Sequence, residues 1–86
     1  MASSPAQARE QIRSYLFEML IPTPPNAWPS DEADLFENGL DSLRLMQLLT
    51  FIENDVGVRL PDEEVTPDRI GSVKSIVEWI SRHRAN

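Results

Sequence analysis

Apolar residues recur at helical spacing in three stretches of this 86-residue chain. Residues 5–20, 43–56 and 73–84 each carry a stripe with steps of three and four residues, which is the period of an α-helix with one buried face. The stripes predict three helices whose inward side chains form the core. The predicted core residues are Ala8, Ile12, Tyr15, Leu16 and Met19 in the first stretch, Leu45, Leu48, Leu49, Ile52 and Val56 in the second, and Val73, Ile76, Val77 and Ile80 in the third.

The ends of these stretches carry residues that favour helix ends. Serine, threonine and aspartate accept hydrogen bonds from the first amides of a helix, proline suits its first position, and glycine tolerates the left-handed conformation after its last residue. A Thr-Pro step also predicts a short fourth helix, and residues 61–65 predict a single helical turn. The predicted boundary residues are Ser4, Pro5, Asp41, Gly57, Thr66, Pro67 and Ser72.

The segment between the first and second helices is rich in proline. Residues 21–34, IPTPPNAWPSDEAD, contain four prolines, which exclude a regular helix and predict one long loop. Ile21 and Trp28 are expected to fix this loop to the body of the protein. Leu35 and Phe36 are expected to close it over the core.

No segment alternates apolar and polar residues for long enough to indicate a sheet. The pattern therefore predicts an all-α fold, a small four-helix bundle with three main helices, one short helix and a long first loop. The length fits one domain, 1–86, with residues 1–4 and 85–86 expected to be disordered. Trp79, which precedes the core residue Ile80, is expected to pack while staying half exposed.

The composition removes several classes of site. The chain has no cysteine and a single histidine, His83, which excludes disulfides, thiolate zinc sites and a histidine-based metal site. The carboxylates at 62–64 lack the ligand order of an EF-hand, so we expect no metal. A hydrolase triad of Ser42, His83 and an aspartate is discounted because no nucleophile elbow surrounds the serine. We therefore expect no catalytic residue and no enzyme activity.

The charge is acidic and unevenly distributed. The formal net charge is −6, and residues 31–68 carry eleven carboxylates against two arginines, which gives that region a net charge of −9. Nucleic acids and anionic membranes are therefore excluded as partners, because cationic side chains supply most of the affinity for them. The acidic region is either a solvated surface or a docking face for proteins with a basic patch.

No stretch approaches the roughly 20 apolar residues of a membrane span, and the N-terminal residues have no apolar core of a signal peptide. The cytoplasm is therefore the expected compartment, and a monomer is the expected state.

Residues 35–43, LFENGLDSL, resemble the signature of the acyl and peptidyl carrier proteins, the phosphopantetheine-binding family. The family pattern is an apolar pair, one or two polar residues, glycine, a hydrophobe and then Asp-Ser-Leu. The resemblance continues through the leucine-rich helix, the acidic step LPDEE at 60–64, the Thr-Pro step and the Ser-Val start of the last helix. It covers residues 10–82, and this ordered set is far more specific than the tripeptide alone.

The resemblance implies a serine that receives phosphopantetheine from coenzyme A through a separate phosphopantetheinyl transferase. Ser42 takes that position, and Gly39, Leu40, Asp41 and Leu43 are its signature neighbours. The thiol of the arm would then hold a cargo as a thioester, loaded by an acyltransferase or an adenylating ligase and used by a downstream synthase or transferase. Asp41 is expected to cap the helix and to help position the magnesium ion that transferases of this family use.

The predicted position of Ser42 also suits a phosphodiester on physical grounds. The first turn of a helix presents unpaired amides and the positive end of the helix dipole, which favour an anion by about 0.3–1 kcal/mol at an exposed site. Gly39 allows the chain to turn sharply before the cap. An Asp-Ser pair before a helix is ordinary by itself, so the interpretation depends on the surrounding pattern.

A second face of the 43–56 helix is expected to contact partner enzymes. Leu43, Met46 and Thr50 share a face that the core stripe does not use, and methionine suits a surface that must fit several enzymes. The alternative is that these residues belong to the core. Arg44 interrupts the acidic residues and is expected to pair with an acid on the partner. The predicted partner face consists of Leu43, Arg44, Met46, Gln47, Thr50, Glu53, Asp62, Glu63 and Glu64.

The chain departs from the carriers of fatty acid synthesis, which resemble one another in having a second helix rich in acidic residues just after the serine. Arg44, Gln47, Thr50 and Asn54 stand where acids are expected, and Phe51 is bulky. These departures favour an acyl carrier of a dedicated polyketide or secondary-metabolite pathway. The alternatives are an aminoacyl or peptidyl carrier of a nonribosomal pathway and a carrier-like module that is never modified and only binds a partner.

Overall fold

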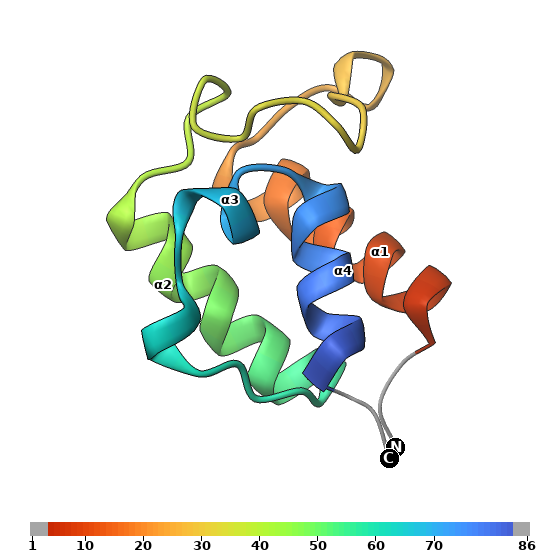
Figure 1. The fold of residues 1–86 in the computed structure, drawn as a ribbon. Coiled ribbons are helices and arrows are strands. Elements are labelled where there is room, and N and C mark those ends of the chain that lie inside the picture. The colour runs from red at the N-terminus through yellow and green to blue at the C-terminus, as the bar shows by residue number, and fades with distance from the viewer. Residues whose placement is uncertain (1–3, 84–86) are drawn as a thin grey trace.

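The computed structural model describes residues 4–83. Within them, three long helices pack around one core and a short helix, α3, packs on α4 (Figure 1). Residues 4–83 contain no β-strand, which confirms the predicted all-α bundle. Of the ends predicted to be disordered, residues 1–3 and 85–86 lie outside the described residues, whereas Ser4 is ordered as a helix cap.

The first helix begins as predicted. In a capping box at the start of α1 (Pro5–Ser14), the Ser4 hydroxyl accepts a hydrogen bond from the backbone N–H of Gln7 at 3.2 Å, and the Gln7 side chain accepts one from the Ser4 N–H at 3.0 Å. These two bonds satisfy amides that have no partner inside the helix.

The helix continues as a π-helix, η1 (Tyr15–Leu20), and this changes which residues face the core. Bonds between residues five apart, such as Ile21 N–H to Leu16 O, widen each turn and rotate the residues that follow. Phe17 and Leu20 are buried as a result. Met19, which the α-helical spacing placed in the core, is 68% exposed instead.

The second long helix comprises α2 (Ser42–Phe51) and the π-helix η3 (Ile52–Val56). Asp41 caps its start and Gly57, at φ 87°, ends it, as predicted. Three of the five predicted core residues are buried. Leu45 and Leu49 are only partly buried, because α2 packs mainly against η1 and has fewer contacts with the other helices. The buried three are Leu48, Ile52 and Val56.

The C-terminal part of the chain forms a 3-10 turn, η4 (Asp62–Glu64), then α3 (Pro67–Ile70) and α4 (Val73–His83). The hydroxyl of Ser72 accepts a bond from Ser75 N–H at 3.1 Å, which confirms the predicted cap. The predicted last residue, Arg84, lies outside the described residues. Of the predicted core residues, Val73, Ile76 and Ile80 are buried and Val77 is partly buried.

Trp79 is completely buried, so the prediction of a half-exposed side chain was wrong. A buried indole needs a partner for its N–H. Glu64, on η4, supplies one, since its Oε1 accepts the Trp79 Nε1–H bond at 2.8 Å.

The first loop is held to the body of the protein by packing and hydrogen bonds. Trp28 packs on Phe17 with ring centroids 5.7 Å apart, the Arg13 guanidinium lies 5.7 Å from the Trp28 ring, and the indole N–H donates to Thr23 O at 3.0 Å. Asp31 accepts bonds from the guanidinium groups of two arginines on α1. The predicted role of Trp28 is therefore confirmed.

Leu35 and Phe36 do not behave alike at the end of this loop. Leu35 is buried, and its N–H donates to Gly71 O at 2.8 Å, so it closes the loop as predicted. Phe36 is 41% exposed and does not close the loop over the core.

Candidate functional site

Ser42 is the first residue of α2 and is exposed. The Asp41 carboxylate accepts a hydrogen bond from Arg44 N–H at 2.8 Å, and Asp41 O accepts one from Leu45 N–H at 2.8 Å, so the cap holds the first turn in place. The Ser42 hydroxyl makes no hydrogen bond to any residue from 4 to 83. It is therefore fixed in position by the backbone and remains accessible to another protein.

The two residues before the cap set the direction from which the chain enters α2. Gly39 has φ +115°, a conformation that L side chains rarely adopt, which confirms the predicted turn. Leu40 is 4% exposed, and its N–H donates to Leu35 O at 2.9 Å. A buried anchor one residue before Asp41 thus places Ser42 at the surface, above the core.

Arg44 links the start of α2 to the end of the first helix. Its Nε donates to Leu20 O at 2.8 Å, and its terminal nitrogen Nη1 pairs with the Asp41 carboxylate. The bond from the Arg44 backbone N–H, followed by the charge of its guanidinium, holds the pKa of Asp41 below its usual range. The sequence predicted that Arg44 pairs with an acid on a partner, but its own chain already supplies both acceptors. The spacing of three residues between Asp41 and Arg44 on a helix was the available signal.

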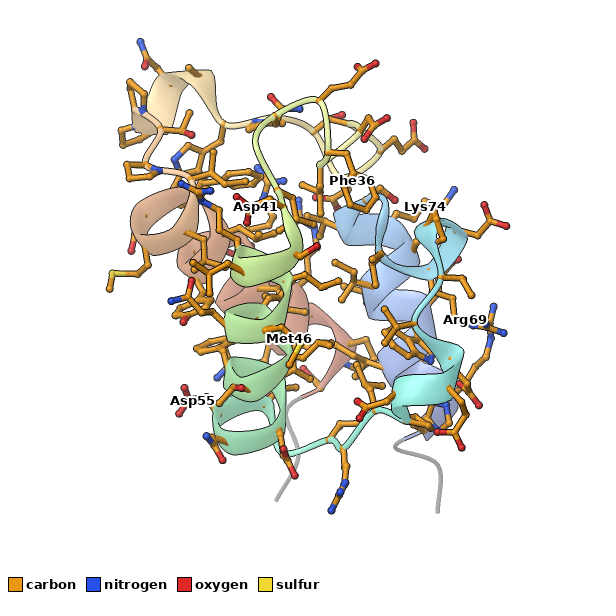
Figure 2. The ribbon with its side chains drawn as sticks, turned by 90° about the vertical axis from the view of Figure 1, so that its left-hand side faces the viewer. Phe36, Asp41, Met46, Asp55, Arg69 and Lys74 are labelled. Carbon is orange, nitrogen blue, oxygen red and sulfur yellow. The ribbon has the colours of Figure 1, made fainter. Side chains whose placement is uncertain are left out.

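The predicted partner face is only partly assembled. Leu43 and Met46 are 69% and 62% exposed, which excludes the alternative that they belong to the core. Figure 2 labels Asp41 at the start of α2 and Met46 further along the same helix. The other exposed members of the predicted face are Gln47, Thr50 and Glu53 on α2 and Asp62 and Glu63 on η4.

Glu64, predicted to meet a partner, is partly buried and is hydrogen-bonded within its own chain. Its Oε1 lies 2.8 Å from Trp79 Nε1 and 2.7 Å from His83 Nε2. The hydrogen bonds from Trp79 and His83, in that order, lower the pKa of Glu64 below its ordinary value. Its carboxylate therefore ties η4 to α4 and is not available in the way that Asp62 and Glu63 are.

The surroundings of Ser42 fit an attached phosphodiester. Among the amides at this helix start, those of Arg44 and Leu45 bond to Asp41, so the N–H groups of Ser42 and Leu43 are the ones left to favour an anion at that end. The side chains of the two residues that follow do not obstruct the hydroxyl, since Leu43 projects into solvent and Arg44 turns back to Leu20. Residues 4–83 contain no group of three or more histidine or acidic side chains that could hold a metal ion.

The family model for the phosphopantetheine attachment site matches residues 21–80. The chain belongs to the phosphopantetheine-binding carrier protein family. Members of this family carry covalent phosphopantetheine and are themselves not enzymes, so this chain is a non-catalytic carrier that a phosphopantetheinyl transferase modifies.

Whole carrier proteins are similar to this one in sequence. The acyl carrier protein of Zymomonas mobilis is 33% identical over 76 residues, which cover 88% of this chain and 94% of that protein. The acyl carrier protein of Campylobacter hominis is 29% identical over 77 residues, which cover 90% of this chain and 94% of that protein.

Solved carrier structures share the fold. A crystal structure of an engineered Bradyrhizobium japonicum glycine:[carrier protein] ligase complexed with carrier protein from Agrobacterium tumefaciens and AMP contains a chain that matches with a TM-score of 0.72 and 31% identity, over 85% of this carrier and 97% of that chain. A chain in the B. japonicum ligase complexed with glycylated carrier protein is 18% identical, with a TM-score of 0.67, and shows the fold alone. Within residues 4–83 of this carrier, no helix is long and apolar enough to cross a membrane.

Proposed function

We propose that this carrier bears phosphopantetheine on Ser42 and presents an acyl or aminoacyl group as a thioester to the enzymes of a dedicated biosynthetic pathway. The exposed hydroxyl of Ser42, at the first residue of α2, carries this proposal. Gly39, Leu40, Asp41 and Leu43 act as its structural neighbours. Gly39 forms the turn, Leu40 is the buried anchor, Asp41 caps the helix and Leu43 is the first exposed apolar residue after Ser42.

Attachment of the arm forms a bond between Ser42 Oγ and phosphorus and breaks the pyrophosphate linkage of coenzyme A, which releases adenosine 3′,5′-bisphosphate as the leaving group. The hydroxyl proton must leave with the help of the transferase or of water, because no base within residues 4–83 is hydrogen-bonded to Ser42 Oγ. The Asp41 carboxylate accepts hydrogen bonds from the backbone and the guanidinium of Arg44. To help position the transferase's magnesium as well, it must use a lone pair that these bonds leave free. The exposed side of α2 then supplies the contacts for the transferase, the loading enzyme and the downstream synthase or transferase.

Between the two cargo classes, we propose an aminoacyl group loaded by an adenylating ligase. The similar carrier from A. tumefaciens was crystallised with a glycine:[carrier protein] ligase, and 97% of that carrier's length aligns with this chain. An acyl group of polyketide or secondary-metabolite assembly is the second candidate, which the scarcity of acids along α2 favours over fatty acid synthesis. The arm comes from coenzyme A whichever cargo it holds, so we propose the cytoplasm as the compartment. We also propose a monomer as the working state.

The proposal is tested by incubating the carrier with coenzyme A, magnesium and a promiscuous phosphopantetheinyl transferase, followed by intact-protein mass and fragment mapping. We expect the mass to rise by one phosphopantetheine on Ser42. The Ser42→Ala variant should remain unmodified yet keep the helical circular dichroism of the parent. Ser30→Ala, which removes another exposed hydroxyl, is the matched control and should be modified normally.

Modification of Ser42→Ala, or no mass gain on the folded parent, would exclude Ser42 as the attachment site. A panel of amino acid and acyl donors, each with its own ligase or acyltransferase, then separates the cargo classes. Loading only by an acyltransferase would favour the polyketide candidate over the aminoacyl one.

A further inference from the structure

A groove runs beside α2 and η3 on the side that faces η1. It has a volume of about 380 Å³ and extends from Met46 on α2 to Asp55 on η3, both of which are labelled in Figure 2. Its apolar wall is the stacked pair of Tyr15 and Phe51, whose ring centroids are 4.2 Å apart with 5° between the ring planes. A neighbouring groove continues on the other side of this pair towards Glu18 on η1.

The polar groups of the groove are neutral along its length and negative at its far end. The amide side chains of Gln47 and Asn54 line it and make no hydrogen bond to any residue from 4 to 83. Asp55 borders both grooves, Glu18 borders the second, and neither carboxylate has an ion-pair partner between residues 4 and 83. No lysine or arginine lines either groove. The arrangement matches an extended ligand that has amide groups along its length and a cation at its end.

The carrier's own loaded arm has this chemistry. A pantetheine arm contains two amide groups, and an aminoacyl thioester ends in a protonated α-amino group at neutral pH. From Ser42, the α-helical rise of 1.5 Å per residue places Phe51 about 14 Å further along the axis, and Asp55 lies beyond it in the π-helix η3. The Asp55 side chain leans back towards Ser42, because Cα–Cβ bonds tilt towards the start of a helix. An extended arm that runs past Met46 can therefore bring its terminal ammonium group to the aromatic pair and Asp55.

The groove is shallow, and a free ligand would bind it weakly. A tethered ligand does not need high affinity, because attachment at Ser42 gives it an effective concentration in the millimolar range. An ammonium group near aromatic rings is stabilised by the negative faces of the rings, and a carboxylate without a partner adds an attraction of the same sign. A neutral acyl end of equal size gains neither effect, so the groove would distinguish aminoacyl from acyl cargo.

We propose that the groove formed by Tyr15, Gln47, Phe51, Asn54 and Asp55 is a resting site for the aminoacyl end of the carrier's own arm. This inference rests on the proposed attachment at Ser42 and deepens it, because it names a cationic cargo and the surface that recognises it. Arg44 lies one helical turn before Gln47, but it does not line the groove, and its guanidinium is already bonded to Leu20 O and paired with the Asp41 carboxylate.

The test compares two isosteric cargoes on the intact carrier. Ser42 is loaded with hydrolysis-resistant amide analogues of the glycyl arm and of the propionyl arm, which differ only in an ammonium or a methyl group at the end. Nuclear magnetic resonance then follows the ring signals of Tyr15 and Phe51 and the methyl signal of Met46. We expect clear shifts with the glycyl arm and much smaller ones with the propionyl arm.

A second readout is the pKa of the glycyl ammonium group, followed by the shift of a ¹³C label in the glycine. We expect the parent to raise it by about half a pKa unit relative to the free glycyl arm. Asp55→Asn should remove part of this rise, whereas Asp62→Asn, which alters an exposed acid on η4, should leave it unchanged. Both substitutions are at exposed positions and are expected to leave the melting temperature unchanged.

Equal shifts for the two cargoes, or an ammonium pKa that Asp55→Asn does not change, would overturn the resting site while leaving attachment at Ser42 intact. Failure to load Ser42 at all would overturn the proposed function and the resting site together. The mass of each loaded sample distinguishes these two results.

Discussion

Met46 and Leu48 are two residues apart on α2 but face opposite environments, which makes them a matched pair for separating function from stability. Met46 is 62% exposed and Leu48 is 0% exposed. We expect Met46→Glu to change the free energy of unfolding by less than about 0.5 kcal/mol, as is usual for a surface substitution. Leu48→Ala removes buried methyl groups from the hydrophobic core and should cost about 2–5 kcal/mol.

For a domain of this size, each kcal/mol shifts the melting temperature by roughly 4–8 °C. Leu48→Ala should therefore melt at least about 8 °C below the parent, and Met46→Glu within about 4 °C of it. Circular dichroism during thermal and urea unfolding measures both. The effect on function should differ from the effect on stability, because Met46 belongs to the exposed side of α2 next to Ser42. Met46→Glu should slow arm attachment or cargo loading at a temperature where the variant is fully folded.

Met46→Leu is the control, because it preserves an apolar side chain of similar volume and should load like the parent. If Met46→Glu melted as early as Leu48→Ala, Met46 would be a core residue and the assignment of faces on α2 would fail. If Met46→Glu loaded at the parent rate with every partner tested, the exposed face would have no role in docking.

Three further predictions concern pH, backbone packing and salt. Hydrogen bonds from Trp79 and His83 lower the pKa of Glu64 from its ordinary value of 4.5, so ionised Glu64 stabilises the fold above pH 4.5 and this stabilisation is lost as the pH falls through the lower folded-state pKa. Glu64→Gln should therefore lose less stability than the parent between pH 6 and pH 3.5, measured by urea unfolding followed by tryptophan fluorescence. An equal loss in the two proteins would contradict this. Gly71→Ala should cost about 1–3 kcal/mol, because the new Cβ would lie 2.7 Å from the backbone oxygen of Pro67, and an unchanged urea midpoint would show that α3 can move to admit it. The net charge of −9 over residues 31–68 predicts that the KM for the carrier in arm attachment rises with added sodium chloride, whereas a KM independent of salt would argue against electrostatic docking.

Much of the helical framework and the attachment residue could be predicted without coordinates. Ser4, Asp41, Gly57 and Ser72 mark helix ends through bonds or backbone angles that involve residues no more than a few positions away. Such interactions depend on local sequence order, so the local sequence determines them. The position of Ser42 follows from the same logic, since the cap, the turn and the serine all lie within a few consecutive residues.

The orientation of individual side chains depended on the tertiary structure. Met19 is exposed because the first helix widens into a π-helix, and the sequence carried no clear sign of that change. Trp79 could be buried only because Glu64, fifteen residues away, accepts its N–H. Arg44 donates to Leu20 O, twenty-four residues away, so it is already bonded within its own chain where an acid on a partner was expected to meet it.

The groove beside α2 has the same origin. Tyr15 and Phe51 come from different helices. The sequence predicted Tyr15 as a core residue and gave Phe51 no structural role, whereas in the structure their rings stack on each other. A pattern of apolar and polar positions reports which side of one helix is buried, because that depends on the period of the helix itself. It does not report which side chains of two helices meet, since the relative placement of helices is set by packing across the whole core.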